Sequence, residues 1–461
     1  MFVPQQSDID ILDQHTPELF IKLFLLNNKF QTIDELEGTL ISGSITLDAD
    51  SDIRRTASFN FYIEDMELYA EQYSKIWMDK FVDLRLGIKN QSTNQMQWYP
   101  LGIFLFNENG FRYDLTTKFI ECSCVDLMAL YTGLRAGTLP GLRTIATYGL
   151  NVTDIVRDTI IQLGNIQNFI INENTNPGYL TIPYELEFGT GVTVYEILKK
   201  ISDIYPATEF FFDIDRTFIW SYMPTATDDP VVLDNDIIAP LVDDENANKD
   251  FSKVKNCIEV WGQDDISARI ILVDELPKSS FIYGTNLVGE VENNSDLPKN
   301  NTEFIIAFGV NPNINDAVRV ISDETMGDRC IEWYVTYIDE DNNISWGMPY
   351  FYFINPDSPF TIDKLGEIWG VFHSGEYSMI YSNELCLDRC LYELYIATSM
   401  QDRLSLSMIL IPFLQPNQKI SYKLKSIGET NQYIVKRINF DLTSYRMQVE
   451  LMKFTPLYSW L

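Results

Sequence analysis

Carboxylates are the most conspicuous candidates for chemistry in this sequence. Asp48, Asp50 and Asp52 have the alternating spacing with which a calcium-binding EF-hand loop begins. Such a loop also needs glycine at its sixth position and glutamate at its twelfth, where this sequence has Ile53 and Phe59. The segment is therefore predicted to be the polar turn of a β-hairpin rather than a metal site.

Other short patterns also lack an essential part. Residues 339–343 (DEDNN) fail the same calcium-loop test, since Ile344 and Tyr350 stand at the sixth and twelfth positions, and we expect a hairpin tip there. Gly189–Gly191 is too short for a phosphate-binding loop, and no G-x-S-x-G nucleophile motif occurs. With 66 Asp and Glu residues, carboxylate pairs of the glycosidase type arise by chance, so their spacing identifies none.

The histidines and cysteines likewise give no indication of a metal site or a catalytic site. The two histidines, His15 and His373, are far apart in sequence, which disfavours zinc sites and histidine-based catalysis. The cysteines form no C-x-x-C pair and are predicted to be buried, reduced thiols; they are Cys122, Cys124, Cys257, Cys330, Cys386 and Cys390. We expect no catalytic residue, no cofactor and no metal, and hence a protein that is not an enzyme.

The composition narrows the classes of partner. The formal net charge of −32 disfavours binding to nucleic acid or to an anionic membrane surface. The N-terminal residues lack the basic region of a signal peptide, and no apolar run approaches the ~20 residues of a membrane span. We therefore expect a soluble protein made in a cytoplasm. Its 461 residues predict about three domains at roughly 150 residues each.

Alternation of apolar and polar residues places strands in the first 133 residues. The pattern has a period of two and is separated by polar turns, which predicts an antiparallel barrel or sandwich. The predicted strands are 20–26, 40–47, 57–63, 82–88, 98–107 and 119–125. A short helix is expected to begin at Asp126, whose carboxylate can accept hydrogen bonds from the first turn.

The remainder alternates between helical and extended patterns. Helices are predicted at 151–163, 194–205 and 383–401, and hairpins at 210–222 and 330–354. Further strands are predicted at 254–263, 404–410, 420–424, 433–442 and 446–454, and the acidic stretch 234–250 is interpreted as a linker. The chain is therefore mainly β, or α+β overall.

Two extended segments carry a resemblance to a known family. The first runs from GSITLDADSDIRRTASFNFYI (43–63) through VDLRLGI (82–88) to WYPLGIFLF (98–106). The second is the continuous sequence from Asn355 to Leu424. Together they resemble the baseplate hub proteins of phage tails, especially those of phages and prophages of Gram-positive bacteria.

The resemblance implies an architecture of two antiparallel β-barrels similar to those of tail tubes. The first barrel would span 1–133, followed by a small α+β domain at 134–233. The second barrel would be split between 234–264 and 382–461, with a β-rich domain inserted at 265–381.

The resemblance also implies a function and partners. Three chains with two barrels each would form a pseudo-sixfold ring in the baseplate of a virion tail, assembled in the host cytoplasm. This homotrimer would join the hexameric tail tube or distal tail protein to a threefold spike or tail-tip protein, and the tape measure protein is a further candidate partner. DNA would pass through an acidic lumen without specific binding.

Two other functions remain open from the sequence. Exposed aromatic residues between 265 and 381 would suit a receptor- or glycan-binding tail-tip module. A tail-associated cell-wall hydrolase would instead depend on one essential Asp or Glu. Neither alternative requires a split second barrel, which is why the hub is preferred.

Overall fold

The computed structural model divides the chain into two compact units. Unit 1 comprises Met1–Lys249 and Asp402–Pro456, and unit 2 comprises Asp250–Gln401 and Leu457–Leu461. The structure describes residues 4–12, 14, 18–35, 40–62, 76–91, 93–114, 116–141, 144–146, 148–175, 177–183, 185–205, 207–223, 233–263, 266–281, 284–321, 329–375, 377–398, 401–425 and 428–454. His15 lies outside the described residues.

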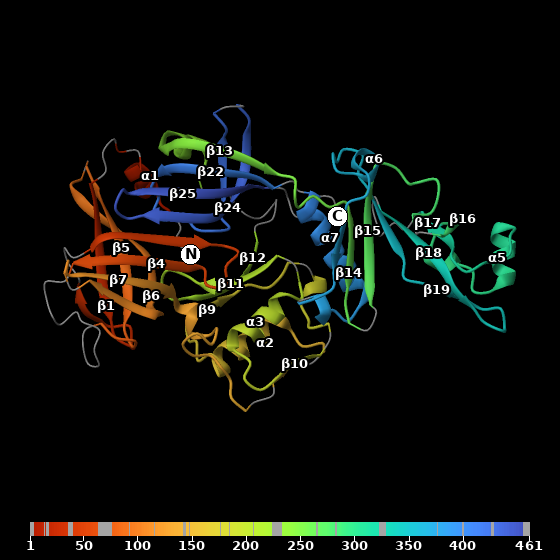
Figure 1. Cartoon of the computed structure of the whole chain (residues 1–461), viewed down its shortest axis with the longest axis horizontal. Coiled ribbons are helices and arrows are strands. Elements are labelled where there is room, and N and C mark those ends of the chain that lie inside the picture. Colours follow the sequence, from red (N-terminus) through yellow and green to blue (C-terminus); the bar gives the residue numbers. More distant parts are fainter. Residues whose placement is uncertain are drawn as a thin grey trace. The chain divides into compact units, whose positions relative to one another are not determined.

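A 12-stranded sheet is the centre of unit 1. Its hydrogen-bonded order is β13-β22-β25-β24-β3-β4-β7-β6-β5-β1-β2, and β23 pairs with β24 beside this path. Figure 1 shows the strands β13, β22, β25 and β24 of this sheet side by side. The strands are β1 (Glu18–Leu26), β2 (Thr32–Glu35), β3 (Leu40–Asp48), β4 (Arg55–Tyr62), β5 (Phe81–Asn90), β6 (Gln95–Asp114), β7 (Phe119–Asp126), β13 (Val242–Asp250), β22 (Gln401–Ile409), β23 (Lys419–Lys423), β24 (Thr430–Asp441) and β25 (Arg446–Lys453). The strand predictions for both ends of the chain are confirmed.

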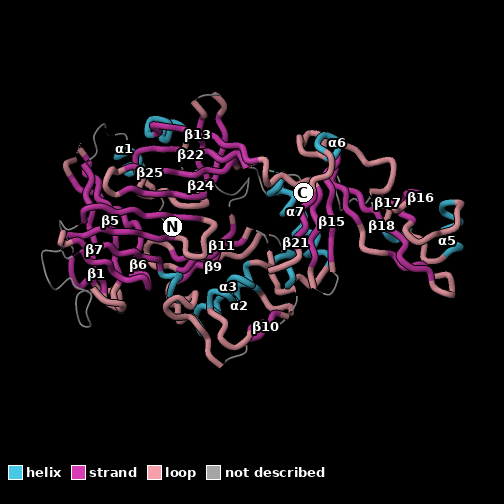
Figure 2. The backbone as a smooth tube through the Cα atoms, viewed as in Figure 1, coloured by secondary structure: helices cyan, strands magenta, loops and turns pink. Residues whose placement is uncertain are grey.

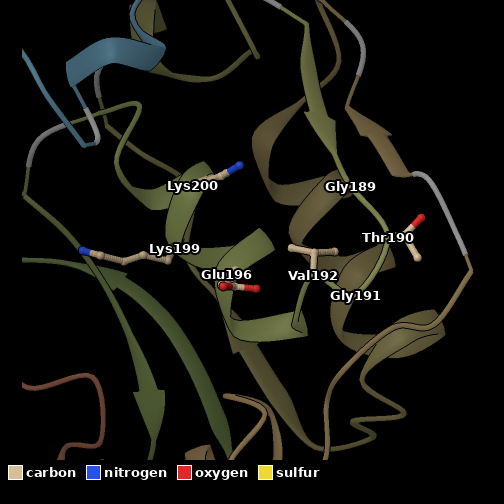
Figure 3. Close-up of a pocket in the computed structure, with 7 residues that line it drawn as sticks. All are labelled: Gly189, Thr190, Gly191, Val192, Glu196, Lys199 and Lys200. Carbon is tan, nitrogen blue, oxygen red and sulfur yellow. The ribbon is translucent and has the colours of Figure 1, made fainter.

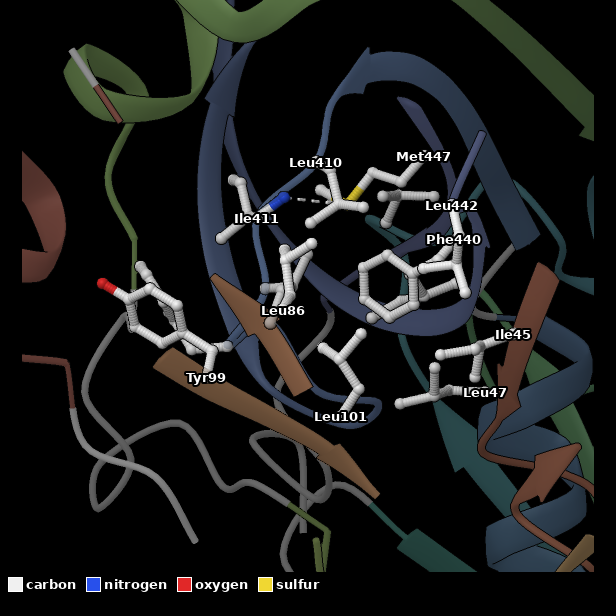
Figure 4. Packing of buried hydrophobic residues seen from close by; sticks show 14 of the residues in the cluster. Ile45, Leu47, Leu86, Tyr99, Leu101, Leu410, Ile411, Phe440, Leu442 and Met447 are labelled. Carbon is white, nitrogen blue, oxygen red and sulfur yellow. Dashed lines mark hydrogen bonds between the residues drawn. The ribbon is translucent and has the colours of Figure 1, made fainter. Parts of the chain in front are cut away.

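One apolar core lies against this sheet. It combines side chains from the N-terminal strands, such as Ile45 and Leu86, with side chains from the C-terminal strands, such as Phe440 and Met447. Figure 4 shows these side chains close together, and the amide of Ile411 donates a 3.4 Å hydrogen bond to the sulfur of Met447. Both ends of the chain therefore contribute to the same hydrophobic core.

The middle of unit 1 forms a small α+β block. A three-stranded sheet has the order β11-β12-β9, and β8 pairs with β10. The elements are β8 (Thr144–Ala146), α2 (Val152–Asp158), β9 (Phe169–Ile171), β10 (Leu186–Phe188), α3 (Val194–Ser202), β11 (Thr208–Phe212) and β12 (Phe218–Tyr222). Thr193 and Glu196 form a capping box that begins α3, and the face with Ile197 and Ile201 is buried. The predicted helices and hairpin of this block are confirmed.

Unit 2 contains a mixed eight-stranded sheet. Its order is β16-β17-β18-β20-β15-β14-β21, with β19 on β18. The elements are β14 (Cys257–Trp261), β15 (Ser267–Val273), β16 (Asn286–Val291), α5 (Asn301–Phe308), β17 (Asp316–Val320), β18 (Arg329–Ile338), β19 (Ile344–Trp346), β20 (Tyr350–Ile354), α6 (Ile362–Leu365), β21 (Trp369–Phe372) and α7 (Asn383–Thr398). Strands predominate over helices in both units, which confirms the mainly β prediction (Figure 2).

The structure corrects three boundaries expected from the sequence. The strand at 254–263 was expected in the second barrel, but as β14 it pairs with β15 and β21 of unit 2. The helix at 383–401 was expected there too, but as α7 it packs on β14 and β15, where the thiol of Cys390 donates to the carbonyl of Ala268 at 3.2 Å. Residues 234–250 are not a linker, because they contain the short helix α4 (Asn235–Ile238) and the strand β13.

These errors share a physical cause. Alternating side chains show which face of a strand is buried but not which strand is its neighbour. The sequence of β13 is almost entirely polar, and five of its side chains between Asp243 and Asn248 are exposed, so it has no alternating pattern to detect. The insertion within the C-terminal β-structure is therefore the whole of residues 250–401, rather than 265–381.

Candidate functional site

The sheet of unit 1 contains the same five-strand arrangement twice. In the first repeat the order is β3-β4-β7-β6-β5, and in the second it is β13-β22-β25-β24-β23. In both repeats the sheet order corresponds to the first, second, fifth, fourth and third strands along the chain. In the second repeat, unit 2 is inserted between the first strand, β13, and the second strand, β22. Each strand of the first repeat thus has a counterpart in the second.

The pairing register of the two repeats also agrees. Tyr62 opposes Phe119 where β4 meets β7, and Ile409 opposes Arg446 at the equivalent place where β22 meets β25. The pairing register of both long strands shifts at the equivalent point. In β6 the shift follows the pair Phe106–Cys124, and in β24 it follows the pair Val435–Leu451. The buried faces correspond as well, because Ile120, Cys122 and Cys124 on β7 match Met447, Val449 and Leu451 on β25.

The turn that follows each long strand is the clearest sequence signal of the repeat. The sequence Asp-Leu-Thr-Thr begins at Asp114, and Asp-Leu-Thr-Ser begins at Asp441. Each aspartate accepts hydrogen bonds from the backbone amides two and three residues later, at 2.9 and 3.2 Å for Asp114 and at 2.8 and 3.3 Å for Asp441. Lys118 and Tyr445 end the two turns with φ of 59° and 56°.

These turn contacts alter the acidity of both aspartates. A hydrogen bond from the Thr117 side chain, together with the turn amides, holds the pKa of Asp114 below its usual value. The Ser444 hydroxyl, which donates to Asp441 at 2.6 Å, has the same effect on the pKa of that residue. The short sequence Asp-Leu-Thr that the two turns share is a sequence signal of the repeat, although the alternation of the strands does not reveal it.

The two repeats are joined edge to edge. The end of β24 pairs with β3 in an antiparallel ladder that runs from Arg437 opposite Asp48 to Asp441 opposite Ser44. The amide of Ala49 donates to the carbonyl of Lys436 at 2.9 Å and extends the contact beyond the ladder. We call this contact, β24 residues 437–441 with β3 residues 44–48, the repeat junction.

The acidic turn after β3 belongs to this junction. Asp50 lies 3.1 Å from the ammonium of Lys436, and Asp48 lies 3.9 Å from the guanidinium of Arg437. Asp52 accepts a hydrogen bond from the hydroxyl of Tyr195. The prediction of a hairpin turn at this segment is confirmed, and its carboxylates have protein partners.

A buried arginine pair connects the sheet with the α+β block. The guanidinium of Arg54 lies 3.2 Å from Glu209 and donates to the carbonyl of Pro416 at 2.9 Å. Arg55 donates to Gln415 at 2.6 Å and to the carbonyl of Phe212. These contacts tie β4, the end of β11 and the loop before β23 together.

The arginine pair is almost fully removed from solvent. Arg55 is 2% exposed, and burial lowers its pKa to about 10, so that it remains charged at neutral pH. Asp213 lies 3.7 Å from Arg55, and Asp126 accepts from the Arg55 amide at 2.9 Å. Burial raises the pKa of Asp126. The cluster is a structural connection, since its charges neutralise one another inside the protein.

An open cavity of about 500 Å³ lies beside the N-terminus of α3. It is lined by Gly189, Thr190, Gly191, Val192, Glu196, Lys199 and Lys200 (Figure 3). Figure 3 shows Lys199 and Lys200 extending in opposite directions, and Lys199 lies 2.9 Å from Asp203. Glu196 accepts the amide of Thr193 within the capping box. The cavity therefore does not combine its basic groups into a phosphate site.

A second buried polar cluster stabilises unit 2. Glu332 is fully buried and lies 3.2 Å from Arg319, and it accepts hydrogen bonds from Ser280 at 2.9 Å and Tyr352 at 3.0 Å. Arg319 also donates to the carbonyl of Pro277 at 2.8 Å. The cluster fixes the loop around residues 277–281 against β18 and β20.

The remaining candidates from the sequence have ordinary structural positions. All six cysteines are buried free thiols, as predicted, and burial raises the pKa of Cys386 to about 11. Asp339 lies at the tip of the β18–β19 hairpin, where it accepts a hydrogen bond from the Asn343 amide at 2.7 Å.

Among the described residues, no cluster of three or more His, Cys, Asp or Glu side chains could hold a metal ion. In that part of the chain, no helix is both long and apolar enough to cross a bilayer.

The fold is similar to that of a solved tail protein, and two prophage tail proteins match less well. The tail protein of Neisseria meningitidis MC58 matches with a TM-score of 0.51 at 9% sequence identity, over 95% of this chain and 98% of that chain. The 43 kDa tail protein of prophage MuSo2 from Shewanella oneidensis gives 0.49 at 8% identity, over 94% and 98%. The prophage tail protein gp18 of Listeria monocytogenes EGD-e gives 0.46 at 9% identity, over 94% and 95%.

Sequence comparison is less informative than the fold. Residues 357–458 match a family described as a domain of unknown function, DUF5048. No curated protein matches the sequence. The similarity to the N. meningitidis protein nevertheless extends over nearly the full length of both chains, so the two proteins share a fold.

Proposed function

We propose that this chain is a structural hub protein in the tail baseplate of a phage or phage-like particle. Three copies form a ring, and each copy contributes its two five-strand repeats, so that the ring has six similar positions. One side of the ring joins the tail tube or distal tail protein, and the other joins a threefold spike or tail-tip protein. The tape measure protein is a further partner of the ring.

The observation that carries this proposal is the repeat junction, which lies within a fold that the chain shares with the N. meningitidis tail protein. Two equivalent repeats joined edge to edge give one chain two of the positions of a sixfold ring. A head-to-tail contact of this type produces a closed ring when its rotation divides a full turn. The fold similarity to the N. meningitidis tail protein supports the assignment of such a ring to a tail.

The charge of the chain suits a channel for DNA. A net charge of −32 makes each trimer strongly acidic. An acidic lumen repels the phosphate backbone, so that DNA passes without adhering to the wall. On this proposal the chain has a structural role and no catalytic one.

The first test is the solution mass of the full chain at near-physiological salt, measured by light scattering. The expected mass is three times the chain mass of 53.3 kDa, with rings visible by electron microscopy. Association with purified tail tube protein is the second measurement, because trimers can require a partner. A monomer that does not associate with tail components, but binds sugars on a glycan array or digests cell walls, contradicts the hub.

A further inference from the structure

The helix α5 of unit 2 has apolar side chains on more than one face. On its buried side, the rings of Phe304 and Phe308 lie 5.0 Å apart, and Phe304 belongs to a small core together with Val335 of β18. Away from this side lie Ile305 and Ile306, of which Ile306 is 79% exposed. A surface helix normally places polar residues towards solvent, so the second apolar face of α5 indicates a contact with another molecule.

Neighbouring residues enlarge this apolar face. The amide of Asn315 donates to the carbonyl of Val335 at 2.8 Å and continues the β17–β18 ladder, a register that places Ile314 beside Tyr337. Figure 1 shows α5 at the end of unit 2 that also contains β16 and β17. We call five side chains at this end, which are between 42% and 79% exposed, the α5 surface; they are Ile305, Ile306, Val310, Ile314 and Tyr337.

The α5 surface is uncharged but has an acidic border. Residues 305–315 contain no charged side chain. Glu303 is exposed on α5, and Glu340 and Asp341 are exposed at the tip of the β18–β19 hairpin. This tip lies against the start of the helix, because the amide of residue 301 donates to the carbonyl of residue 342 at 3.0 Å. Lys299 is the basic residue of segment 296–315, so the border has a net negative charge.

We propose that the α5 surface binds a partner protein whose apolar contact surface is flanked by Lys or Arg side chains. The apolar centre supplies most of the binding energy, and the acidic border selects a partner of opposite charge. The inference goes beyond the proposed function, because it concerns one surface of unit 2 rather than the ring.

A second copy of this chain is a poor occupant of the α5 surface. Two such surfaces placed face to face bring their acidic borders together, and each chain has a net charge of −32. Like charges across an interface act against a partner, whereas basic groups at the border act in its favour.

The position of unit 2 in the chain agrees with a separate binding role. The first repeat has a short turn at 49–54 where the second repeat contains unit 2. A five-strand repeat therefore forms without such an insertion.

A pair of synthetic peptides tests the proposed chemistry with the full chain. The first is an amphipathic helix of about 18 residues, or about five turns, with Leu along one face and Lys at the flanking positions. The second has Glu in place of Lys. Fluorescence anisotropy of the labelled peptides at near-physiological salt is expected to show that the Lys peptide binds about tenfold more tightly than the Glu peptide, or better.

Three variants locate the binding. Ile306→Gln is expected to weaken binding of the Lys peptide about tenfold, whereas binding elsewhere on the acidic chain would not change. Val371→Gln is the matched control and should bind as the native chain does, because this 52% exposed residue lies in β21 at the other edge of the same sheet. Glu340→Gln/Asp341→Asn should reduce the preference for Lys over Glu. All of these side chains are exposed, so folding is expected to be preserved.

The possible outcomes separate this inference from the proposed function. Absence of binding by the Lys peptide, or equal binding by the native chain and Ile306→Gln, overturns the partner surface. Light scattering is expected to give the native chain and Ile306→Gln the same mass. A lower mass for Ile306→Gln would identify a second copy as the occupant and would also overturn the inference. The mass of the native chain tests the hub independently of the peptide result.

Discussion

At the scale of single residues, unit 1 depends on charged groups that are buried. Arg54 and Arg55 are 5% and 2% exposed, yet they have carboxylate and carbonyl partners from the α+β block and from the loop before β23. A buried ion pair of this type contributes little to the stability of the fold, because desolvation offsets the attraction between the charges. Removal of one partner lowers stability strongly, since the other partner then stays buried without its counter-charge.

Arg55→Met is therefore expected to lower the free energy of unfolding of unit 1 by roughly 3–5 kcal/mol. The substitution removes the donors to Gln415 and to the carbonyl of Phe212. Urea unfolding followed by tryptophan fluorescence measures the change, because Trp220 is buried in the α+β block. Arg157→Ala, which removes an exposed ion pair with Asp154, is the matched control and should cost less than about 1 kcal/mol. Equal effects of the two variants would contradict the structural role of the buried arginine.

The aspartates of the two equivalent turns predict a pH dependence. Their lowered pKa values mean that the ionised carboxylates stabilise the folded state above the ordinary pKa of about 3.9. This stabilisation is lost as the pH falls through the lowered folded-state pKa. Asp441→Ala should lower stability at pH 7 by less than about 1 kcal/mol, because solvent screens the exposed carboxylate, and the difference from the native chain should shrink towards pH 2.

Thermal unfolding at a series of pH values measures this difference. Asp114→Ala in the first repeat is the matched variant and should change stability in the same direction with the same pH dependence. A difference between native and variant chains that stays constant from pH 7 to pH 2 would show that the carboxylate charge has no role in these turns.

At the scale of elements, two backbone segments of unit 2 approach each other closely at Gly262. A Cβ atom at Gly262, which follows β14, would lie 2.3 Å from the carbonyl oxygen of Ile380. The amide of Gln263 donates to the same oxygen at 2.8 Å. This contact holds the end of β14 against the segment that leads into α7, so it contributes to the placement of both elements in unit 2.

Gly262→Ala is expected to destabilise unit 2 by roughly 1–3 kcal/mol, because backbone atoms must move to admit the methyl group. Gly189→Ala is the control, since no heavy atom lies within 4 Å of its added Cβ, and it should change stability by no more than about 0.5 kcal/mol. Differential scanning calorimetry of both variants distinguishes the two cases. A neutral Gly262→Ala variant would mean that the Ile380 segment is free to shift.

At the scale of the whole molecule, the internal repeat explains where the insertion lies. In the first repeat a short turn at 49–54 joins β3 to β4. The equivalent connection in the second repeat, between β13 and β22, contains residues 251–400 instead. A connection at this position can vary in length at little cost, because loop-closure entropy grows slowly with length.

Replacement of residues 251–400 by the six-residue turn 49–54 is therefore expected to leave unit 1 folded. Circular dichroism should retain a β-rich spectrum, and unfolding should remain cooperative. Formation of an intrachain disulfide in the variant Thr46→Cys/Asn439→Cys, whose two positions are opposed in the repeat junction, checks that the junction survives the excision. Loss of cooperative unfolding would show that unit 1 needs the insertion in order to fold.

The local structure of this protein can be predicted from the pattern of its amino acids alone. Period-two alternation located the strands from Phe20 to Val125 and from Leu404 to Phe454, and helical spacing located the helix that begins at Asn383. The incomplete motifs at 48–59 and 339–350 were identified as hairpin turns, which the structure confirms. Each of these features depends on neighbours within a few residues, which a sequence pattern records.

The pairing of the strands, in contrast, cannot be predicted from these local patterns. Nothing in the alternation of 254–263 distinguishes a partner in unit 1 from a partner in unit 2, and the polar sequence of β13 conceals a strand that hydrogen bonds hold in place. The equivalence of the two repeats likewise depends on register and buried faces, since their sequences share little beyond Asp-Leu-Thr. Partner choice depends on contacts between residues hundreds of positions apart, such as Asp48 with Arg437, and local patterns contain no record of such contacts.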